Sequence, residues 1–453
     1  MDFFVKEIVT QVLSLYNYTP DFNKKNKPKI TSISNPNVVK DKFLIKSDGN
    51  FCVLVVEFAV KADGGYKKIS LNMKIPRMKN CFNHANFIGM NCIKVVKALI
   101  YAYTIKSVDK SILMSVIEKT IEESIIAIML GNKQPNALSD PLVDRISMLL
   151  RNLSAWSNRT YEGRKVPFSL VIDAPKAYKK IENFQIIESF LKDDASALLT
   201  DGITSYLSIS DKIEYKIAKY CNAENLSRKI PLVPYRFTNI ANVCSKDKIG
   251  IILTVQGDVL FIKQTKLVFA KRNGLWHFYD YGAFNSALFN DMPEINSISS
   301  GKDNIRKIYI SCLDTAFART GGCLCIFTMN NLDKVKKDVR DEDKHKPYYL
   351  GPKQDEHKKR FMLEDVVINK KTFYTLGRKA IQEIMGIDGA TIISPSGDFL
   401  TTGAIINNQT SKRIKTNGGA RTKIAIKLSK YGIAIKVSAD GYFKCYKNQK
   451  HIF

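Results

Sequence analysis

Arg421 and Lys423 occupy the position in this sequence that most clearly suggests chemistry. They follow a glycine-containing run at 416–420, Thr-Asn-Gly-Gly-Ala, and precede a helix expected over 424–430. A helix N-terminus offers free N–H groups and partial positive charge, and glycines let the backbone approach an anion closely. Arg and Lys side chains there could hold a triphosphate. Residues 401–453 contain eleven Lys or Arg and one acid, so we expect an anionic ligand; a glycine-rich turn before a basic surface helix is the simpler alternative.

The elements that must position these residues alternate between helix and strand, which predicts a mixed α/β sheet with flanking helices. Asp388 and Gly389 stand directly before one of the apolar strands. No Walker A motif is present, so the anion would not be held by a P-loop. Helices are predicted over 304–319, 375–385 and 424–430, and strands over 323–328, 390–394, 399–407, 432–438 and 442–446.

Three short motifs follow one another in this region, and a serine, Ser438, ends the strand after the third. The motifs are Ala318-Arg319-Thr320-Gly321-Gly322-Cys323-Leu324, Asp388-Gly389-Ala390, and Gly419-Ala420-Arg421-Thr422-Lys423-Ile424-Ala425. In this order they resemble the motifs of the diadenylate cyclase domain, the nucleotide-binding domain of the DisA family. The resemblance covers residues 303–453.

The resemblance implies a DisA-like mixed β-sheet and a homodimer or larger homo-oligomer that condenses two ATP molecules to cyclic di-AMP. Asp388 would hold a Mg²⁺ or Mn²⁺ ion near the reacting groups. Arg421 and Lys423 would grip the β- and γ-phosphates and stabilise the leaving pyrophosphate. The implied catalytic residues are Asp388, Arg421 and Lys423, and the implied nucleotide-binding residues are Gly389, Ala390, Gly419, Ala420, Arg421, Thr422, Lys423 and Ser438.

The sequence departs from the family motif Gly-Thr-Arg-His-Arg at three positions, which hold Ala420, Thr422 and Lys423. Losing one such hydrogen bond typically costs about 1–3 kcal/mol. An inactive domain that senses a nucleotide or a cyclic dinucleotide is therefore a second hypothesis. A nucleic-acid-binding protein is a third, which the charge allows but no recognised motif supports.

The preceding chain is predicted to fold as an N-terminal α+β segment, 1–160, and a mixed segment, 165–295, that ends in an antiparallel β-meander. An amphipathic helix is expected over 110–130. Tight turns between 251 and 279 indicate the meander. Residues 333–360 are predicted to be a charged insertion, either solvated surface or a lid over a phosphate site.

Two groups of side chains before residue 303 could carry chemistry, and each has a simpler structural explanation. Trp276, Phe278 and Tyr279 could stack on a base, although aromatic residues of a strand usually belong to a core. Cys81, His84 and Cys92 could be imagined as metal ligands, but they lack a fourth ligand at a recognised spacing. We expect ordinary packing in both places, and His277 is expected to be structural.

The composition of the chain limits its number of domains, its disulfide content and its expected location. The 453 residues, 45% hydrophobic with a net charge of +27, predict a globular protein of two to four domains whose surface attracts phosphates. The nine cysteines are an odd number without a Cys-x-x-Cys pair, so a disulfide scaffold is not expected. Neither a signal peptide nor a membrane span is predicted, and we expect a cytoplasmic protein.

Overall fold

The structure, a computed structural model, describes residues 37–48, 51–62, 65–76, 110–131, 140–158, 160–161, 163–193, 199–219, 230–298, 300–335, 371–404 and 419–453. The chain forms two compact units. The first consists of Met1–Tyr220 and Asn239–Tyr279, and the second of Cys221–Thr238 and Asp280–Phe453. Each unit combines helices with a sheet of parallel and antiparallel strands, which confirms the α+β class. The predicted segments 1–160, 165–295 and 303–453 stay predictions.

The first unit contains a three-stranded antiparallel sheet, a seven-stranded mixed sheet and a short two-stranded one. The three-stranded sheet is formed by β1 (Asn37–Asp48), β2 (Phe51–Ala62) and β3 (Gly65–Pro76), and the two-stranded one by β4 (Thr160–Tyr161) and β5 (Arg164–Lys165). The seven strands lie in the order β12 (Leu275–Phe278), β11 (Lys266–Arg272), β10 (Val259–Lys263), β9 (Lys248–Leu253), β6 (Phe168–Asp173), β7 (Ser205–Ile209) and β8 (Ile213–Ile217). Strands β9 to β12 pair antiparallel in sequence order, so the predicted meander is confirmed.

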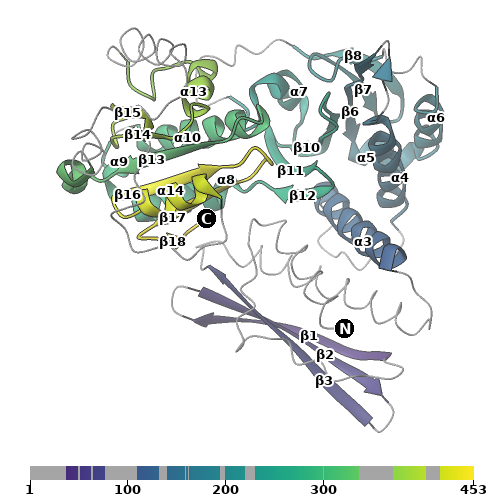
Figure 1. Ribbon diagram of the computed structural model, residues 1–453. Coiled ribbons are helices and arrows are strands. Elements are labelled where there is room, and N and C mark those ends of the chain that lie inside the picture. The colour runs from purple at the N-terminus through teal and green to yellow at the C-terminus, as the bar shows by residue number, and fades with distance from the viewer. Residues whose placement is uncertain are drawn as a thin grey trace. The chain divides into compact units, whose positions relative to one another are not determined.

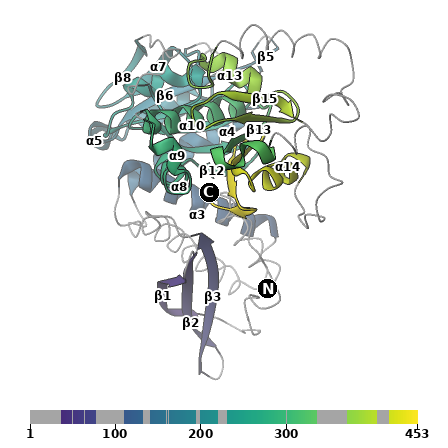
Figure 2. The same ribbon diagram turned by 90° about the vertical axis from the view of Figure 1, so that its left-hand side faces the viewer.

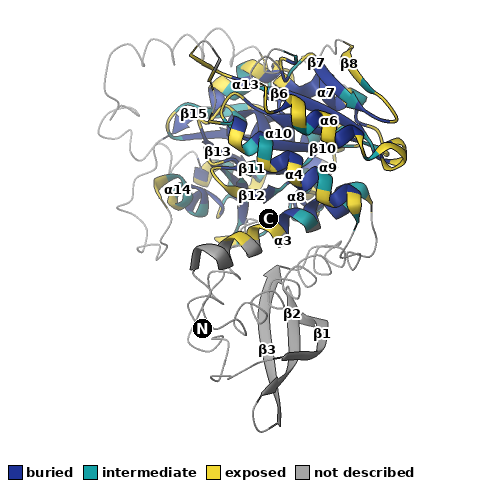
Figure 3. Ribbon diagram, turned by 90° about the vertical axis from the view of Figure 1, so that its right-hand side faces the viewer, coloured by how far each residue is buried: buried dark blue, intermediate teal, exposed yellow. Residues whose placement is uncertain are grey.

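Among the described residues, the first helix of this unit is α3 (Lys110–Leu130), whose bounds agree with the predicted helix. Helix α4 (Pro141–Trp156) is capped by Asp140, whose carboxylate accepts a hydrogen bond of 3.0 Å from the Leu142 N–H. The inner strands are buried along most of their length (Figure 3). Trp276 and Tyr279 are buried as well, as the core interpretation of these aromatic residues requires. The other α-helices in the described part of this unit are α5 (Ala174–Ala177), α6 (Asn183–Phe190) and α7 (Thr238–Val243).

The second unit is built on a six-stranded mixed sheet (Figure 1). Its strands lie in the order β15 (Phe399–Ala404), β14 (Ala390–Ile393), β13 (Gly322–Phe327), β16 (Gly432–Val437), β17 (Phe443–Lys447) and β18 (Lys450–His451). Only β13 and β14 among these pair parallel. The α-helices that the structure describes in this unit are α8 (Tyr281–Asp291), α9 (Pro293–Asn296), α10 (Gly301–Phe317), α13 (Arg378–Met385) and α14 (Ala420–Leu428).

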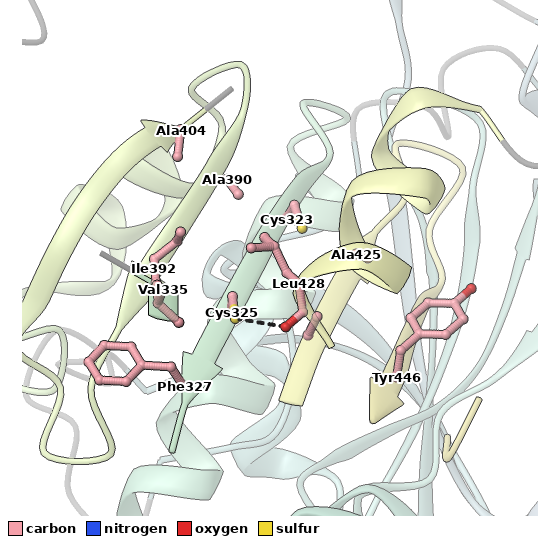
Figure 4. Packing of buried hydrophobic residues seen from close by; sticks show 11 residues of the cluster. Cys323, Cys325, Phe327, Val335, Ala390, Ile392, Ala404, Ala425, Leu428 and Tyr446 are labelled. Carbon is pink, nitrogen blue, oxygen red and sulfur yellow. Dashed lines mark hydrogen bonds between the residues drawn. The ribbon is translucent and has the colours of Figure 1, made fainter. Parts of the chain in front are cut away.

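Helix α14 covers one face of this sheet, whereas α10 and α13 lie on the other (Figure 2). Ala425 and Leu428 of α14 pack against Cys323, Cys325 and other alternate residues of the central strands (Figure 4). The opposite face carries Thr391, whose hydroxyl donates to the Ile384 carbonyl of α13 at 3.5 Å. Period-2 alternation along β13 therefore sends successive side chains to two different helical layers.

A buried ion pair joins α10 to α13. Arg378 Nε and Nη2 each donate to the Asp314 carboxylate at 2.7 Å, and both side chains are almost fully buried. Arg378 Nη2 also donates to the Val233 carbonyl at 2.8 Å, and the Tyr235 N–H donates to Asp314 at 2.8 Å. Burial raises the pKa of Asp314, opposed by the adjacent guanidinium. This network ties the segment before residue 238 into the second unit.

The structure corrects the boundaries of three predicted helices. The helix expected over 375–385 begins at Arg378, because Gly377 has an extended backbone and is its N-cap. The helix expected over 304–319 spans Gly301–Phe317, because Arg319 has a left-handed φ of 58° that cannot continue a helix. The helix expected over 424–430 begins at Ala420, because Gly419 serves as its N-cap. Arg421 and Lys423 therefore belong to the first turn of α14.

Several predictions concern residues outside the described ranges. These are Cys81, His84 and Cys92, residues 416–418 of the glycine-containing run, and positions 336–360 of the charged insertion. Among the helices that the structure describes, none combines the length and the apolar composition needed to cross a membrane.

Candidate functional site

Asp388 lies on a tight turn between α13 and β14, and glycine backbones determine its position. Gly389 has a φ of 105°, and a Cβ atom placed on it would lie 2.4 Å from the carbonyl carbon of Gly403. Gly403 in turn has a φ of 62°, and a Cβ there would lie 3.0 Å from the Asp388 carbonyl oxygen. The two backbones thus touch where no side chain fits. The Asp388 side chain points outward and is 96% exposed.

Arg421 brings the second and third motifs together. Its Nη2 atom lies 3.2 Å from Asp388 Oδ1, although 33 residues separate the two positions. The Arg421 side chain is about one-third exposed. An ion pair this open to water contributes at most about 1 kcal/mol to stability. The carboxylate and the guanidinium can therefore separate, and each can bind a ligand instead, with little loss of stability.

The first motif reaches the same place through Gly321, which has a φ of 66°. A Cβ on Gly321 would lie 2.8 Å from Arg421 Nη1, 3.2 Å from the Val437 carbonyl oxygen and 3.3 Å from the Ala439 nitrogen. The guanidinium therefore passes directly over this glycine, beside the end of β16. Any side chain at position 321 would displace it.

The other predicted nucleotide-binding residues differ in what they can offer to a ligand. Gly419, Ala420 and Lys423 are exposed at the start of α14, and Thr422 is half-buried. Ala390 is fully buried in the cluster under α14, so only its backbone could face a nucleotide. Ser438 is buried, and its hydroxyl donates to Asp440 Oδ2 at 3.0 Å, which stabilises the turn between β16 and β17.

Asp388 is the candidate metal ligand. Among the described residues, no group of three or more His, Cys, Asp or Glu side chains could hold a metal ion. Mg²⁺ is commonly held by one or two carboxylates together with substrate phosphates and water. Asp388 offers one exposed carboxylate, which contacts Arg421, so any divalent ion held there would need further ligands from a nucleotide and water.

The described cysteines offer no reactive thiolate. Cys244, Cys312, Cys323, Cys325 and Cys445 are free and buried. Burial raises the pKa of the Cys244 and Cys323 thiols to about 12, so both stay protonated near neutral pH.

Lys436, Tyr442 and Lys444 are residues that the sequence analysis missed. The two lysines are direct cross-strand partners on β16 and β17, close to the Ser438 turn. Both ammonium groups lie against the Tyr442 ring, with Nζ to ring-centroid distances of 4.8 Å for Lys436 and 5.5 Å for Lys444. The sequence shows only that lysines flank a short turn. That the two lysines pair depends on the strand register, which the local sequence does not determine.

No protein-family model, curated protein or solved structure matches this chain.

Proposed function

We propose that the second unit is a nucleotide-binding domain of the diadenylate cyclase type, with a DisA-like sheet, in a cytoplasmic protein. The observation that carries the proposal is the position of Arg421. Its guanidinium contacts Asp388 at 3.2 Å and lies over Gly321, so residues from three separated motifs meet at one point. The N-terminus of α14 adds free N–H groups and partial positive charge at the same place.

In the proposed reaction two copies of the domain each hold one ATP. The 3′-hydroxyl oxygen of each ATP bonds to the α-phosphorus of the other, the bond from that phosphorus to the bridging oxygen breaks, and pyrophosphate leaves. The hydroxyl proton passes to solvent. Asp388 would hold a divalent ion, which when bound would neutralise phosphate charge and lower the pKa of the hydroxyl. Arg421 and Lys423 stabilise the charge that develops on pyrophosphate.

The test is incubation of the full chain with ATP and Mn²⁺ or Mg²⁺, followed by chromatography and mass spectrometry of the nucleotides. We expect cyclic di-AMP from the wild type and a loss of at least about 100-fold in Asp388→Asn. Glu383→Gln is the matched control, because Glu383 is an exposed carboxylate on α13 that pairs with Lys379 at 2.9 Å. Its activity should equal that of the wild type.

A sensor is the second candidate, and a specific observation favours it. Thr422 stands where the resembling motif has histidine. The partner of the Asp388 carboxylate is the Arg421 guanidinium, and among the described residues no second carboxylate shares the contact. A sensor binds ATP or cyclic di-AMP without forming product, and Arg421→Gln would weaken that binding. Absence of both product and nucleotide binding in the wild type would reject both candidates.

A further inference from the structure

The hairpin of β16 and β17 places two lysines directly opposite each other. Lys436 pairs with Lys444 in the antiparallel register, and Lys436 Nζ donates to the Tyr442 hydroxyl at 3.4 Å. Both ammonium groups also face the Tyr442 ring, which attracts cations. We call these three residues the lysine pair cluster. Both ammonium groups therefore lie within 5.5 Å of the centroid of one ring.

Such a pair is unfavourable unless something negative compensates it. Like charges directly opposite on a sheet destabilise it, and both side chains are half-buried. In the described part of the chain neither lysine forms an ion pair with a carboxylate. The nearby Asp440 carboxylate accepts a hydrogen bond from Ser438 instead.

The proximity of the two positive charges changes the pKa of Lys444. Burial and the adjacent Lys436 lower the pKa of Lys444 to about 8. His451 also faces Lys444, and burial together with that charge lowers the pKa of the imidazole to about 3, so it stays neutral. An anion bound between the ammonium groups would raise the pKa of Lys444 again.

The cluster lies on the face of the sheet that α14 covers. Lys436 is two residues beyond Ala434, which packs under α14, and pairs across the sheet with Cys323 of the same cluster. Because α14 leads into β16 through a short turn, the helix N-terminus returns beside the C-terminal end of that strand. Arg421 confirms this placement, since its guanidinium and the Val437 carbonyl both lie against Gly321.

We propose that Lys436, Tyr442 and Lys444 form a binding site for a phosphate-type anion, a site distinct from the contacts that the three motifs supply. Assigning that anion to the terminal phosphates of ATP rests on the proposed function. Free pyrophosphate or free phosphate has the same chemistry and is the alternative source of the bound anion. The Tyr442 hydroxyl and two ammonium groups together provide hydrogen-bond donors and a charge of +2 for a dianion.

The experiment is calorimetric titration of the full chain at pH 7 with pyrophosphate, ATP and AMP in separate arms. The test variant is Lys436→Gln/Lys444→Gln. The control is Lys430→Gln/Lys450→Gln, which removes the same charge from two exposed positions of the same unit. A second variant, Lys436→Arg/Lys444→Arg, keeps the charge, and circular dichroism confirms that each variant is folded.

We expect pyrophosphate to bind the wild type, the control and the Arg variant, and to bind the Gln variant at least about tenfold more weakly. An equal loss for ATP but not for AMP assigns the site to terminal phosphates. A loss for pyrophosphate with ATP unchanged assigns it to free anions. Pyrophosphate affinity that is undetectable in the wild type, or equal in the Gln variant and its control, overturns the proposal. If the Gln variant does not fold, loss of pyrophosphate binding in the Arg variant overturns it instead. None of these outcomes depends on whether cyclic di-AMP forms.

Discussion

At the scale of single residues, Arg421 links the parts of the candidate site. It contacts an exposed carboxylate on one side and a glycine backbone on the other, so neither partner competes strongly with a ligand. Lys444 is different, because its charge is half-buried beside another charge. The two cations are therefore expected to differ in their effect on stability: Arg421 matters little, whereas Lys444 opposes folding until an anion binds.

Replacing Lys444 by Met should stabilise the chain at pH 7 without anions. The pKa of Lys444 is lowered to about 8 from an ordinary value of 10.5, so the charged form is disfavoured in the folded state. This penalty is fully present below about pH 8, decreases as the pH rises, and vanishes above the unfolded value. We expect Lys444→Met to raise the free energy of unfolding by about 1–3 kcal/mol at pH 7, with the gain disappearing near pH 10.5.

Urea unfolding of wild type and variant at both pH values measures this difference. Lys450→Met, at an exposed position of β18, is the control and should change stability by less than about 0.5 kcal/mol. A Lys444→Met variant that is less stable than the wild type at pH 7 would show that the ammonium group is already compensated in the free protein.

At the scale of elements, the turn before β14 is determined by two glycines that face each other. Gly389→Ala should lower the free energy of unfolding by about 2–4 kcal/mol, because left-handed strain adds to overlap with the Gly403 backbone. Gly377→Ala is the matched control, since its φ is −68° and a Cβ there meets nothing within 4 Å. Its cost should stay below about 1 kcal/mol. Equal unfolding midpoints for the two variants would contradict the close approach.

The elements were more predictable than their contacts. Helix α3 has the predicted bounds, and the antiparallel meander lies at its predicted position, because local periodicity and turn residues determine both. Helix α14 begins four residues before the prediction, because Ala420 and Lys423 are good helix formers that the apolar pattern ignores. The pairing of Asp314 with Arg378, and of Lys436 with Lys444, depends on how distant elements pack, so neither could be predicted from local sequence.

At the scale of the whole molecule, the net charge of +27 favours any polyanion, including nucleic acid. The structure adds specific positions to that general attraction. In the second unit, Arg421 and the lysine pair cluster lie near the N-terminus of α14, on the same face of the sheet. We therefore propose a small phosphate ligand rather than an extended duplex, which would need a broad positive surface.

The proposed reaction also makes a prediction about assembly, because each product needs two nucleotides held by two copies of the chain. The rate of cyclic di-AMP formation per mole of protein should rise with protein concentration over roughly 10 nM to 10 µM, and level off where the dimer dominates. Wild type pre-mixed with an equal amount of Asp388→Asn should lose about half its activity per wild-type chain, since half of its partners are inactive. A rate per mole that is constant at all concentrations, together with unchanged activity in the mixture, would mean that one chain acts alone. That outcome would contradict the two-copy reaction while leaving nucleotide binding at Arg421 intact.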